Sequence, residues 1–455
     1  MSQTALATIS LDMDKAIGRI KPMHAVGQPP TQGWNDYSMF HFLREAHIPY
    51  SRLHDTGGAF GKNIYVDIPN LFRDFDADEN DPASYDFAFT DLLLAELMKN
   101  GVEPFFRLGV TIENKTEIRK YRIFPPKDFA KWARVCEHVV AHYNEGWANG
   151  FHYGITYWEI WNEADDRANP EESFMWCGTF SEYCRLYEIT AKHLKAKFPS
   201  IKVGGPASCG FYAAEPGKPL QVASDMPEDD WRRKYAVHFI DCTHQFLDHV
   251  RDTASPMDFF SFHSYSLPDD LLQQTECIAL ELERRELKGV ELILDEWLPN
   301  ASLKRIRTPL QNSEIASIIV RGQHSALDML MLYDARCAAR NSYAPLFDPM
   351  TARPAGAYWA LFYFGELYRR GQEVFSSVEG DAGALCAVAA TDGKDCALML
   401  VNPGDEPRAL NFETNGATFR FGAVTDEDRT NDLITSCPTS IGPHAFMLVV
   451  FERPR

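Results

Sequence analysis

The chain has 455 residues, of which 45% are hydrophobic and 24% are charged, the composition of an ordinary soluble globular protein. Its 45 basic and 64 acidic residues give a formal net charge of −19. Such a surface repels phosphate backbones and anionic lipid headgroups, so we expect neither nucleic acid nor a membrane among its partners. The charge fits a neutral substrate, or simply an acidic surface that keeps the protein in solution.

The cysteines and the N-terminus bear on the cellular location. The ten cysteines are scattered singly, without a CxxC pair, which favours a reducing compartment. Residues 1–20 lack the basic end and the apolar run of a signal peptide. No segment approaches the roughly 18 uninterrupted apolar residues of a membrane span. These features predict a soluble cytoplasmic protein.

Short apolar segments alternate with longer helical ones along most of the chain. Eight segments are apolar on both faces or nearly so, as buried parallel strands are. They are His24–Val26, Tyr50–Leu53, Pro104–Leu108, Thr156–Trp161, Lys202–Gly205, Asp258–Phe262, Glu291–Leu294 and Met329–Leu332. The expected helices are Asp36–Ala46, Phe87–Lys99, Asp128–His142, Phe180–Lys197, Trp231–His249, Asp269–Leu287, Ser313–Ser325 and Ala355–Tyr368. Eight strand–helix repeats over about 350 residues favour a closed (β/α)8 TIM barrel over an open sheet.

Local signals mark several of the helix ends. Asn100-Gly101 is a C-cap signal after the second helix. Thr179 with Glu182 three residues later matches a capping box, and Asp128 after two prolines indicates a helix start. No GxGxxG motif follows the first strand, so a dinucleotide-binding fold is unsupported.

The C-terminal part of the chain follows a different pattern. Short apolar or alternating runs are separated by turn signals such as Asn402-Pro403-Gly404 and Asn415-Gly416, which predicts an antiparallel β-sandwich. The segment Ala7–Asp12 is also strand-like and could add a strand to it. We therefore expect residues 1–22 to join the sandwich, 23–370 to form the barrel and 371–455 to form the C-terminal β-sandwich.

Two carboxylates are expected at the mouth of the barrel, where the carboxyl ends of the strands form the active site. The fourth strand ends in Asn162 and Glu163, and the seventh ends in Glu296. Strand alternation would place Glu159, Trp161 and Glu163 on one side of the strand. Glu159 would lie deeper and could be a buried structural acid. Glutamates at strand ends can be ordinary salt-bridge residues, but two of them beside aromatic residues favour a site.

Hydrolysis of a glycosidic bond with retention requires two such groups. One protonates the leaving oxygen and the other attacks the anomeric carbon, and the two lie about 5–5.5 Å apart. Opposed carboxylates across a barrel mouth can meet that distance, so the two strand ends are compatible with a retaining glycoside hydrolase.

A family resemblance rests on the same strand ends. The segments WEIWNEAD, residues 158–165, and ILDEW, residues 293–297, resemble the clan of retaining (β/α)8 glycosidases. The wider context is most similar to glycoside hydrolase family 39, the β-xylosidase and α-L-iduronidase family. The further stretches that carry this similarity are Tyr50–His54, Tyr85–Gly101, Pro104–Gly109, Lys202–Pro206, Phe260–Tyr265 and Arg353–Ala360. The resemblance covers nearly the whole chain and implies a barrel flanked by a β-sandwich built from both termini.

The resemblance also implies roles for individual residues. Glu163 would be the acid/base and Glu296 the nucleophile. Asn162 would hydrogen-bond the sugar 2-hydroxyl, and His263 and Tyr265 would border the nucleophile. A tyrosine hydroxyl at that place can donate to the carboxylate and keep it ionised.

The remaining substrate-binding candidates are His54, Asp55, Trp297 and Asp334. His54 would contact a sugar hydroxyl, and Trp297, next to the nucleophile, would stack on a sugar ring. Asp334 and Arg336 could bind substrate or pair with each other. Other aromatic residues near strand ends, which could stack on sugars or pack the top of the barrel, are Trp34, Phe60, Tyr65, Trp161, Tyr265 and Tyr333.

Three positions depart from the pattern of the family. Ala164 follows the Asn-Glu pair where proline is common, Asp55 follows His54 where glycine is common, and Arg107 stands where these xylosidases usually carry glutamate. Arg107 could bind a substrate carboxylate or pair with Asp55. These departures bear on the β-xylosidase specificity more than on the chemistry.

Other kinds of chemistry are less well supported. No HxH or HExxH motif and no clustered carboxylate spacing occurs, and GxSxG is absent, so we expect no metal, no cofactor and no serine nucleophile. The long segments Gly57–Ser84 and Cys209–Asp230 could wall off a pocket, which favours exo action. We expect an exo-acting enzyme for oligosaccharides, on β-xylosides or α-L-arabinosides. The alternatives are an endo-acting glycanase of the same clan and a sugar-binding barrel without catalysis.

Overall fold

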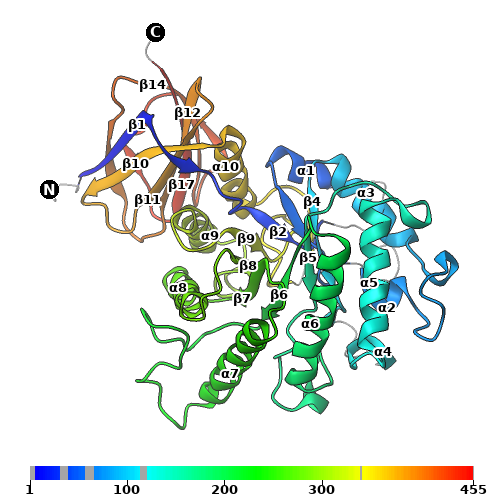
Figure 1. Cartoon of the computed structure of the whole chain (residues 1–455). Helices are drawn as coiled ribbons and strands as arrows, with labels where there is room; N and C mark the ends of the chain where they lie inside the picture. Colours follow the sequence, from blue (N-terminus) through cyan, green and yellow to red (C-terminus); the bar gives the residue numbers. More distant parts are fainter. Residues whose placement is uncertain (1–5, 31–38, 57–65, 113–119, 339–340, 454–455) are drawn as a thin grey trace.

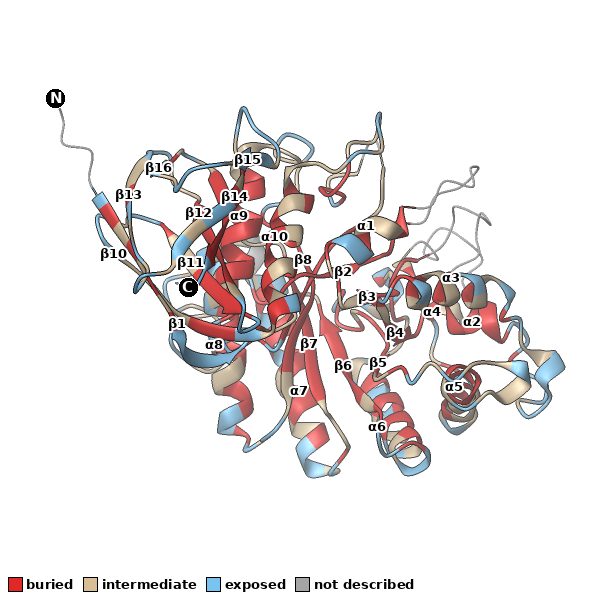
Figure 2. Cartoon of the chain, turned by 90° about the horizontal axis from the view of Figure 1, so that it is seen from above, coloured by how far each residue is buried: buried red, intermediate tan, exposed pale blue. Residues whose placement is uncertain are grey.

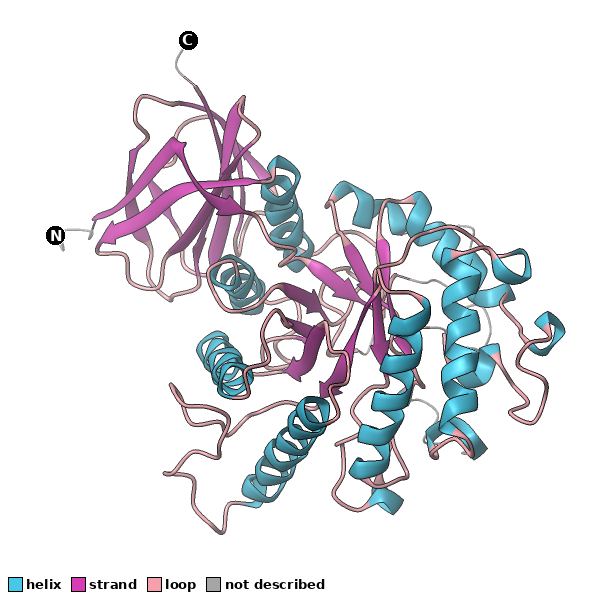
Figure 3. Ribbon diagram, viewed as in Figure 1, coloured by secondary structure: helices cyan, strands magenta, loops and turns pink. Residues whose placement is uncertain are grey.

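The computed structural model describes residues 6–30, 39–56, 66–112, 120–338 and 341–453. It has two parts: a closed barrel of eight strands wrapped by helices, and a nine-stranded sheet beside it (Figure 1). Figure 3 shows the helices gathered around the barrel, while the second part consists of strands and loops. The structure confirms the predicted (β/α)8 barrel with an accessory β domain. Within the described residues, no helix has the length and apolar character needed to span a bilayer.

The barrel strands lie where the apolar segments predicted them. They are β2 (Ala25–Gly27), β3 (Tyr50–Arg52), β4 (Glu103–Leu108), β5 (Tyr157–Ile160), β6 (Lys202–Ser208), β7 (Phe259–Ser264), β8 (Glu291–Trp297) and β9 (Met329–Leu332). Neighbouring strands all run parallel, and β2 pairs with β9 to close the ring. The carboxyl ends of all eight strands therefore meet at one mouth.

The helices pack their apolar faces on the outside of this ring, and burial is concentrated along that interface (Figure 2). They are α1 (Phe40–Glu45), α2 (Ile68–Leu71), α3 (Ala88–Lys99), α4 (Lys120–Ile123), α5 (Phe129–Asn144), α6 (Phe180–Lys197), α7 (Trp231–Asp252), α8 (Pro268–Arg284), α9 (Pro309–Gly322) and α10 (Gly356–Arg370).

Three helix ends follow the signals in the sequence. Asp128 caps α5 by accepting from two backbone N–H groups of the first turn. Thr179 and Glu182 form the reciprocal capping box of α6. Asn100 ends α3, and Gly101 follows it with φ +74°, the left-handed conformation that glycine adopts without strain.

The second part is one sheet with the strand order β15-β14-β17-β12-β11-β10-β1-β13-β16. The strands are β1 (Leu6–Arg19), β10 (Gln372–Gly380), β11 (Cys386–Thr391), β12 (Asp395–Asn402), β13 (Arg408–Glu413), β14 (Thr418–Thr425), β15 (Asp432–Ile434), β16 (Ser440–Ile441) and β17 (Ala445–Glu452). Ile9 of β1, Leu398 of β12 and Val449 of β17 share one apolar core, so the sheet encloses a core as a sandwich does. The N-terminal strand β1 lies between β10 and β13. It runs antiparallel to β10 and parallel to β13, and the other pairs of the sheet are antiparallel.

The interior of the barrel is layered. The bottom layer is apolar and comprises Ala25, Phe105, Tyr157, Phe259, Ile293, Met329 and Met331. Because side chains on one face of a strand recur every two residues, the layer above it takes its members two positions later. Four of those members are polar and fully buried: Arg107, Glu159, Ser261 and Asp295. The charged layer therefore lies directly beneath the mouth.

Candidate active site

Arg52, at the end of β3, is the cation around which the site is built. Its side chain is buried, and its Nη2 donates to Oδ1 of Asn162 over 2.6 Å. Its Nε lies 2.8 Å from Oε2 of Glu159 and 2.8 Å from Oδ2 of Asp295, and its Nη1 lies 3.3 Å from Oε2 of Glu296. Burial acts to lower the pKa of Arg52, but the three carboxylates outweigh it and raise the pKa. Arg52 thus stays charged under the mouth.

The end of β5 turns sharply before Glu163. The strand stops at Ile160, and Trp161 and Glu163 have φ values of +74° and +44°, which are unusual for residues other than glycine. The side chain of Trp161 packs outward against Trp132 and Trp176. The predicted alternation that grouped Trp161 with Glu159 is therefore wrong, because the strand geometry ends at Ile160. Strained backbone of this kind is common at functional sites.

Glu163 lies in a setting that favours its protonated form. Its Oε1 is 2.7 Å from Nδ1 of His263, and its own side chain is only 18% exposed. Burial, followed by the charge of Asp166, raises the pKa of Glu163 to about 8. A carboxylic acid that keeps its proton at neutral pH can serve as a general acid.

Glu296 comes from a bulged part of β8. Phe262 of β7 pairs with Leu294 but His263 pairs with Glu296, so Asp295 is an extra residue in the register. The bulge lets two consecutive carboxyl groups, those of Asp295 and Glu296, reach the interior side.

The contacts of Glu296 favour its ionised form. The hydroxyl of Tyr265 donates to Oε1, and the Arg52 guanidinium lies beside Oε2. Burial raises the pKa of Glu296, while His263, Arg52 and the Tyr265 hydrogen bond act to lower it and the Glu163 charge adds to the rise. Glu163 lacks a cation in direct contact among its described partners, so the two carboxyl groups have different environments.

The two glutamates face each other across the mouth at short range. One carboxyl oxygen of Glu163, one ring nitrogen of His263 and one carboxyl oxygen of Glu296 lie within 4.8 Å of one another. A closest approach this short is compatible with the carboxyl separation of retaining glycosidases, about 5–5.5 Å, and is shorter than the roughly 6.5–9.5 Å separation of inverting ones. Three such donors could also surround a cation. However, His263 already contacts Glu163, and the positive charge of Arg52 beside Glu296 would oppose a second cation.

Two other residues proposed to bind the sugar lie beside Arg52. Asn162 is fully buried, and its Nδ2 has no hydrogen-bond partner among the described residues. His54 follows β3, and its Nε2 lies 3.2 Å from Oδ1 of Asp55. Asp55 also accepts from the backbone N–H of Ile112 and from the Tyr333 hydroxyl. The structure thus brings these residues to the mouth, and their contacts with a sugar are part of the proposed function.

Arg107 does not pair with Asp55. Its Nη2 lies 2.8 Å from Oδ1 of Asp67, and both side chains are fully buried. Asp67 lies just before α2, in the segment after β3, and also accepts from the backbone N–H of Thr111. The predicted Arg107–Asp55 ion pair is therefore wrong, because the following loop brings a different carboxylate to the guanidinium.

The aromatic surface of the mouth differs from the expected one. Trp297 is fully buried and exposes no ring face to a sugar in this structure. Tyr212 is 50% exposed and hydrogen-bonds the backbone of Tyr265. Tyr343 is 37% exposed, and its ring packs on the ring of Tyr265. Tyr212 and Tyr343 are therefore exposed aromatic residues beside Tyr265, which donates to the proposed nucleophile. Trp34, Phe60 and Tyr65 lie outside the described residues.

Asp334, after β9, is fully buried and holds Arg336. Its Oδ1 accepts from the backbone N–H of Arg336, and its Oδ2 accepts from Nε and Nη2 of that side chain. Of the two alternatives for Asp334, the pair is present. Of the two long segments, residues 57–65 lie outside the described residues, and Cys209–Asp230 connects β6 to α7.

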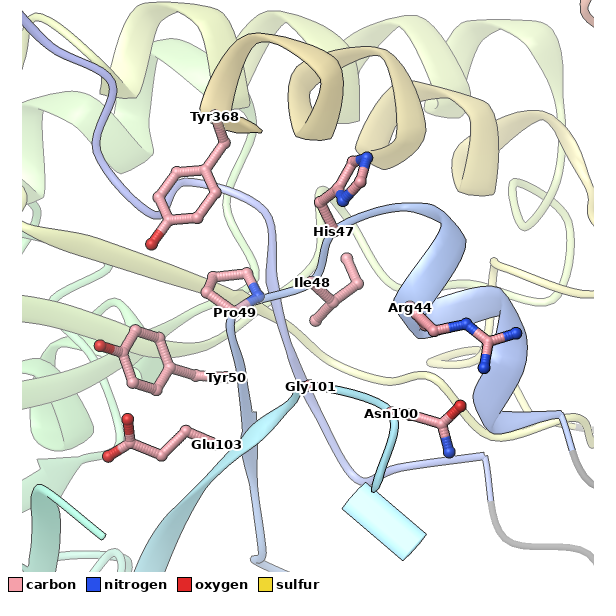
Figure 4. Close-up of a pocket in the computed structure, with 9 residues that line it drawn as sticks. All are labelled: Arg44, His47, Ile48, Pro49, Tyr50, Asn100, Gly101, Glu103 and Tyr368. Atoms are coloured by element: carbon pink, nitrogen blue, oxygen red, sulfur yellow. The ribbon is translucent and has the colours of Figure 1, made fainter. Parts of the chain in front are cut away.

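A separate cavity of about 430 Å³ lies at the opposite end of the barrel (Figure 4). Its lining includes Tyr50 and Glu103, which begin β3 and β4. In a (β/α)8 barrel this amino end serves stability, whereas chemistry occurs at the carboxyl end. The candidate site is therefore the Glu163–Glu296 mouth.

Sequence reasoning assigned no role to Arg52, Asp295 or Tyr212. Arg52 could have been noticed, because a charged residue inside an apolar barrel strand needs buried partners. Asp295 could not, because alternation places it on the opposite side from Glu296 until the bulge in β8 is known. Tyr212 lies in a long loop whose path no local pattern indicates.

Comparisons with known proteins agree with this geometry. The sequence model described as Glycosyl hydrolases family 39 matches residues 64–301, just over half of the chain. A β-xylosidase of Geobacillus stearothermophilus is 24% identical over 297 residues, covering 58% of this chain and 51% of that protein. The chain thus matches about half the length of this relative. A glucosidase structure from Croceicoccus marinus has a TM-score of 0.76 at 18% identity over 100% of both chains. A monomeric β-xylosidase structure from Caulobacter crescentus has a TM-score of 0.65 at 16% identity, covering 98% of this chain and 100% of that one.

Proposed function

Because the chain belongs to glycosyl hydrolases family 39, we propose that it hydrolyses glycosidic bonds with retention, using Glu163 as acid/base and Glu296 as nucleophile. The observation that carries the proposal is the close approach of these two carboxyl groups in different environments. Glu163 holds a proton near neutral pH, while Glu296 receives hydrogen bonds from Tyr265 and contacts Arg52.

The reaction proceeds in two displacements. In the first, Glu163 donates its proton to the leaving oxygen as the Glu296 carboxylate attacks the anomeric carbon and the glycosidic C–O bond breaks. In the second, the Glu163 carboxylate takes a proton from water, the water oxygen attacks the anomeric carbon, and the bond to Glu296 breaks. The acid and nucleophile are thereby restored, and the product keeps the configuration of the substrate.

The proposed substrates are β-xylosides or α-L-arabinosides at the end of an oligosaccharide. The β-xylosidase relative supports the first of these. Asn162, whose Nδ2 has no hydrogen-bond partner in the described part of the chain, would donate to a sugar hydroxyl, and His54, Asp55, His263 and Asp334 would line the sugar site. Tyr212 replaces Trp297 as the proposed stacking residue, because its ring is accessible. A cytoplasmic location, where short imported oligosaccharides would be cleaved, stays a prediction.

The proposal is tested by a screen against p-nitrophenyl glycosides, comprising the β-D-xyloside, α-L-arabinopyranoside, α-L-arabinofuranoside, β-D-glucoside, β-D-glucuronide and α-L-iduronide. Glu296→Ala should lower turnover by at least about 10⁴-fold, as removal of a catalytic nucleophile does in other enzymes. Glu291→Gln is the matched control, since Glu291 begins the same strand and pairs with Lys202 far from the mouth. Proton NMR of the first product formed should show the anomer of the substrate.

Each outcome of this screen has a distinct meaning. Normal turnover in Glu296→Ala would overturn the nucleophile assignment, and an inverted first product would overturn the retaining mechanism. Turnover only on longer xylo-oligosaccharides would favour the endo-acting alternative. Binding of xylose oligomers without any hydrolysis would favour the non-catalytic alternative.

A further inference from the structure

The charges beneath the nucleophile do not balance if every group is ionised. Arg52 is the cation in contact with Glu159, Asp295 and Glu296. Three further titratable groups face this cluster: Tyr265 and Glu163, which act on Glu296, and His263 of β7, whose Nε2 lies 3.7 Å from both Asp295 Oδ1 and Glu296 Oε2. Burial lowers the pKa of His263 to about 4, so the ring is neutral at neutral pH. Three buried carboxylates around one cation would leave two negative charges uncompensated, which is costly in a buried site.

The hydrogen bonds of the cluster show the same deficit. The Arg52 Nε–H points at Oε2 of Glu159, so the nearby Asp295 oxygens receive no well-directed hydrogen bond. Both oxygens of Asp295 and Oε1 of Glu159 lack a partner among the described residues. The Ser261 side chain also contacts Glu159, and the carboxyl groups of Glu159 and Asp295 meet at the same Arg52 guanidinium, 2.7 Å and 2.8 Å from its nitrogens, and contact each other. Buried polar atoms are normally paired, and one proton between these two groups would pair them.

We propose that Asp295 is a positioning residue for the nucleophile. Asp295 stays protonated at neutral pH, donates a hydrogen bond to Glu159 and so leaves Glu296 ionised beside Arg52. The assignment of the proton to Asp295 rather than Glu159 follows from the contacts. Glu159 accepts directed hydrogen bonds from Arg52, which stabilise its charged form, whereas Asp295 accepts none from the described residues. The role in catalysis rests on the proposed function, but the protonation itself does not.

The proton matters because Asp295 is the neighbour of Glu296 in the chain. An ionised Asp295 would repel the Glu296 carboxylate and raise the pKa of Glu296, so less of the nucleophile would be ionised. A neutral Asp295 removes that repulsion and fixes Glu159 against Arg52. The bulge in β8 that brings Glu296 to the mouth thus places it beside a second interior acid, and the proton cancels the charge of that acid.

Infrared spectroscopy tests the protonation without any substrate. The starting variant is Glu163→Gln, which removes a carboxyl group whose raised pKa of about 8 would itself give a carboxylic acid band near neutral pH. Its spectrum should contain the C=O stretching band of a carboxylic acid, and Glu163→Gln/Asp295→Asn should lack that band. Glu163→Gln/Asp334→Asn is the matched control and should keep the band, because Asp334 accepts three hydrogen bonds from Arg336.

The outcomes separate this inference from the proposed function. Three results would each overturn the proposed protonation: absence of the band in Glu163→Gln, its persistence in the double variant Glu163→Gln/Asp295→Asn, or failure of that double variant to fold. Misfolding would count against the proposal because an amide closely replaces a neutral carboxyl group. Loss of the band with Asp295→Asn supports the protonation whether or not the enzyme cleaves any glycoside tested.

The effect on the nucleophile is tested by the pH profile of kcat/KM in Asp295→Asn. The acidic limb should stay within about 0.3 units of wild type, because an amide then replaces a neutral carboxyl group and no charge changes. A nearby charge would produce a shift of about 1–3 units. If Asp295 carries a charge, its removal would lower the pKa of Glu296, and the limb would move to lower pH by about one unit or more. Such a move would overturn the proposal.

Discussion

The imidazole of His263 bridges the two proposed catalytic groups: Nδ1 lies 2.7 Å from Oε1 of Glu163, and Nε2 lies 3.7 Å from Oε2 of Glu296. A neutral imidazole accepts at one nitrogen and donates at the other. Protonated Glu163 can therefore donate to Nδ1, while the N–H at Nε2 faces the carboxylate side of the site. One buried ring thus stabilises the acid form of one glutamate and the charged form of the other.

The first prediction concerns the alkaline side of the pH profile. The general acid must be protonated, so kcat/KM should fall as the pH rises through about 8, the pKa of Glu163 in the free enzyme. Glu163→Gln should lose this limb and lose about 10²–10⁴-fold in rate on substrates with poor leaving groups. Aryl glycosides with activated leaving groups should still form the glycosyl-enzyme, which mass spectrometry of the intact protein would detect. An equal loss on both classes in that first step would argue against the acid role.

The second prediction concerns the hydroxyl of Tyr265. Its hydrogen bond to Glu296 acts to lower the pKa of that carboxyl group, so Tyr265→Phe should raise the pKa. Because the nucleophile must be ionised, the acidic limb of kcat/KM should move to higher pH. The shift should be about one to two units, since a hydrogen bond to a charged group contributes about 1.5–3 kcal/mol. Tyr343→Phe is the control, because the Tyr343 ring packs on Tyr265 while its hydroxyl makes no hydrogen bond to Glu296 among the described residues. An unmoved limb in Tyr265→Phe would show that this hydrogen bond does not set the charge of Glu296.

The fold could be predicted from the sequence because its signals are local. Buried parallel strands are short and apolar, and Asp128 and Thr179 carry cap chemistry that acts within one helical turn. The positions of Glu163 and Glu296 at strand ends follow from the same pattern.

The fine structure of the site could not be predicted in this way. The left-handed conformation of Trp161 ends the alternation of β5, and the bulge at Asp295 shifts the register of β8. Both depend on packing between strands that are far apart in sequence. The partner of Arg107 depends in turn on the path of the loop that carries Asp67.

The third prediction concerns the role of Arg107. Arg107→Ala would break the buried ion pair with Asp67, which typically destabilises a protein by about 3–5 kcal/mol. Urea unfolding followed by circular dichroism would measure the change. Arg107→Ala/Asp67→Asn should recover part of the loss, because the second change removes the uncompensated charge. If Arg107 instead recognises a substrate carboxylate, Arg107→Ala would keep its stability and lose only activity on uronides.

The fourth prediction concerns Arg52, whose replacement combines both effects. Arg52→Leu removes the cation that faces three buried carboxyl groups, so the free energy of unfolding should fall by about 3–5 kcal/mol. The exposed pair Arg73–Asp86 provides the control, since Arg73→Leu should cost only about 0–1 kcal/mol.

Arg52→Lys keeps a charge but loses the planar fork that contacts Asn162 and the carboxylates at once, so it should recover stability only in part. In Arg52→Lys the acidic limb of kcat/KM should also move to higher pH, because a weaker contact with the cation raises the pKa of Glu296. Stability of Arg52→Leu within about 1 kcal/mol of wild type would contradict a central role for this arginine, because that is the range of an exposed pair.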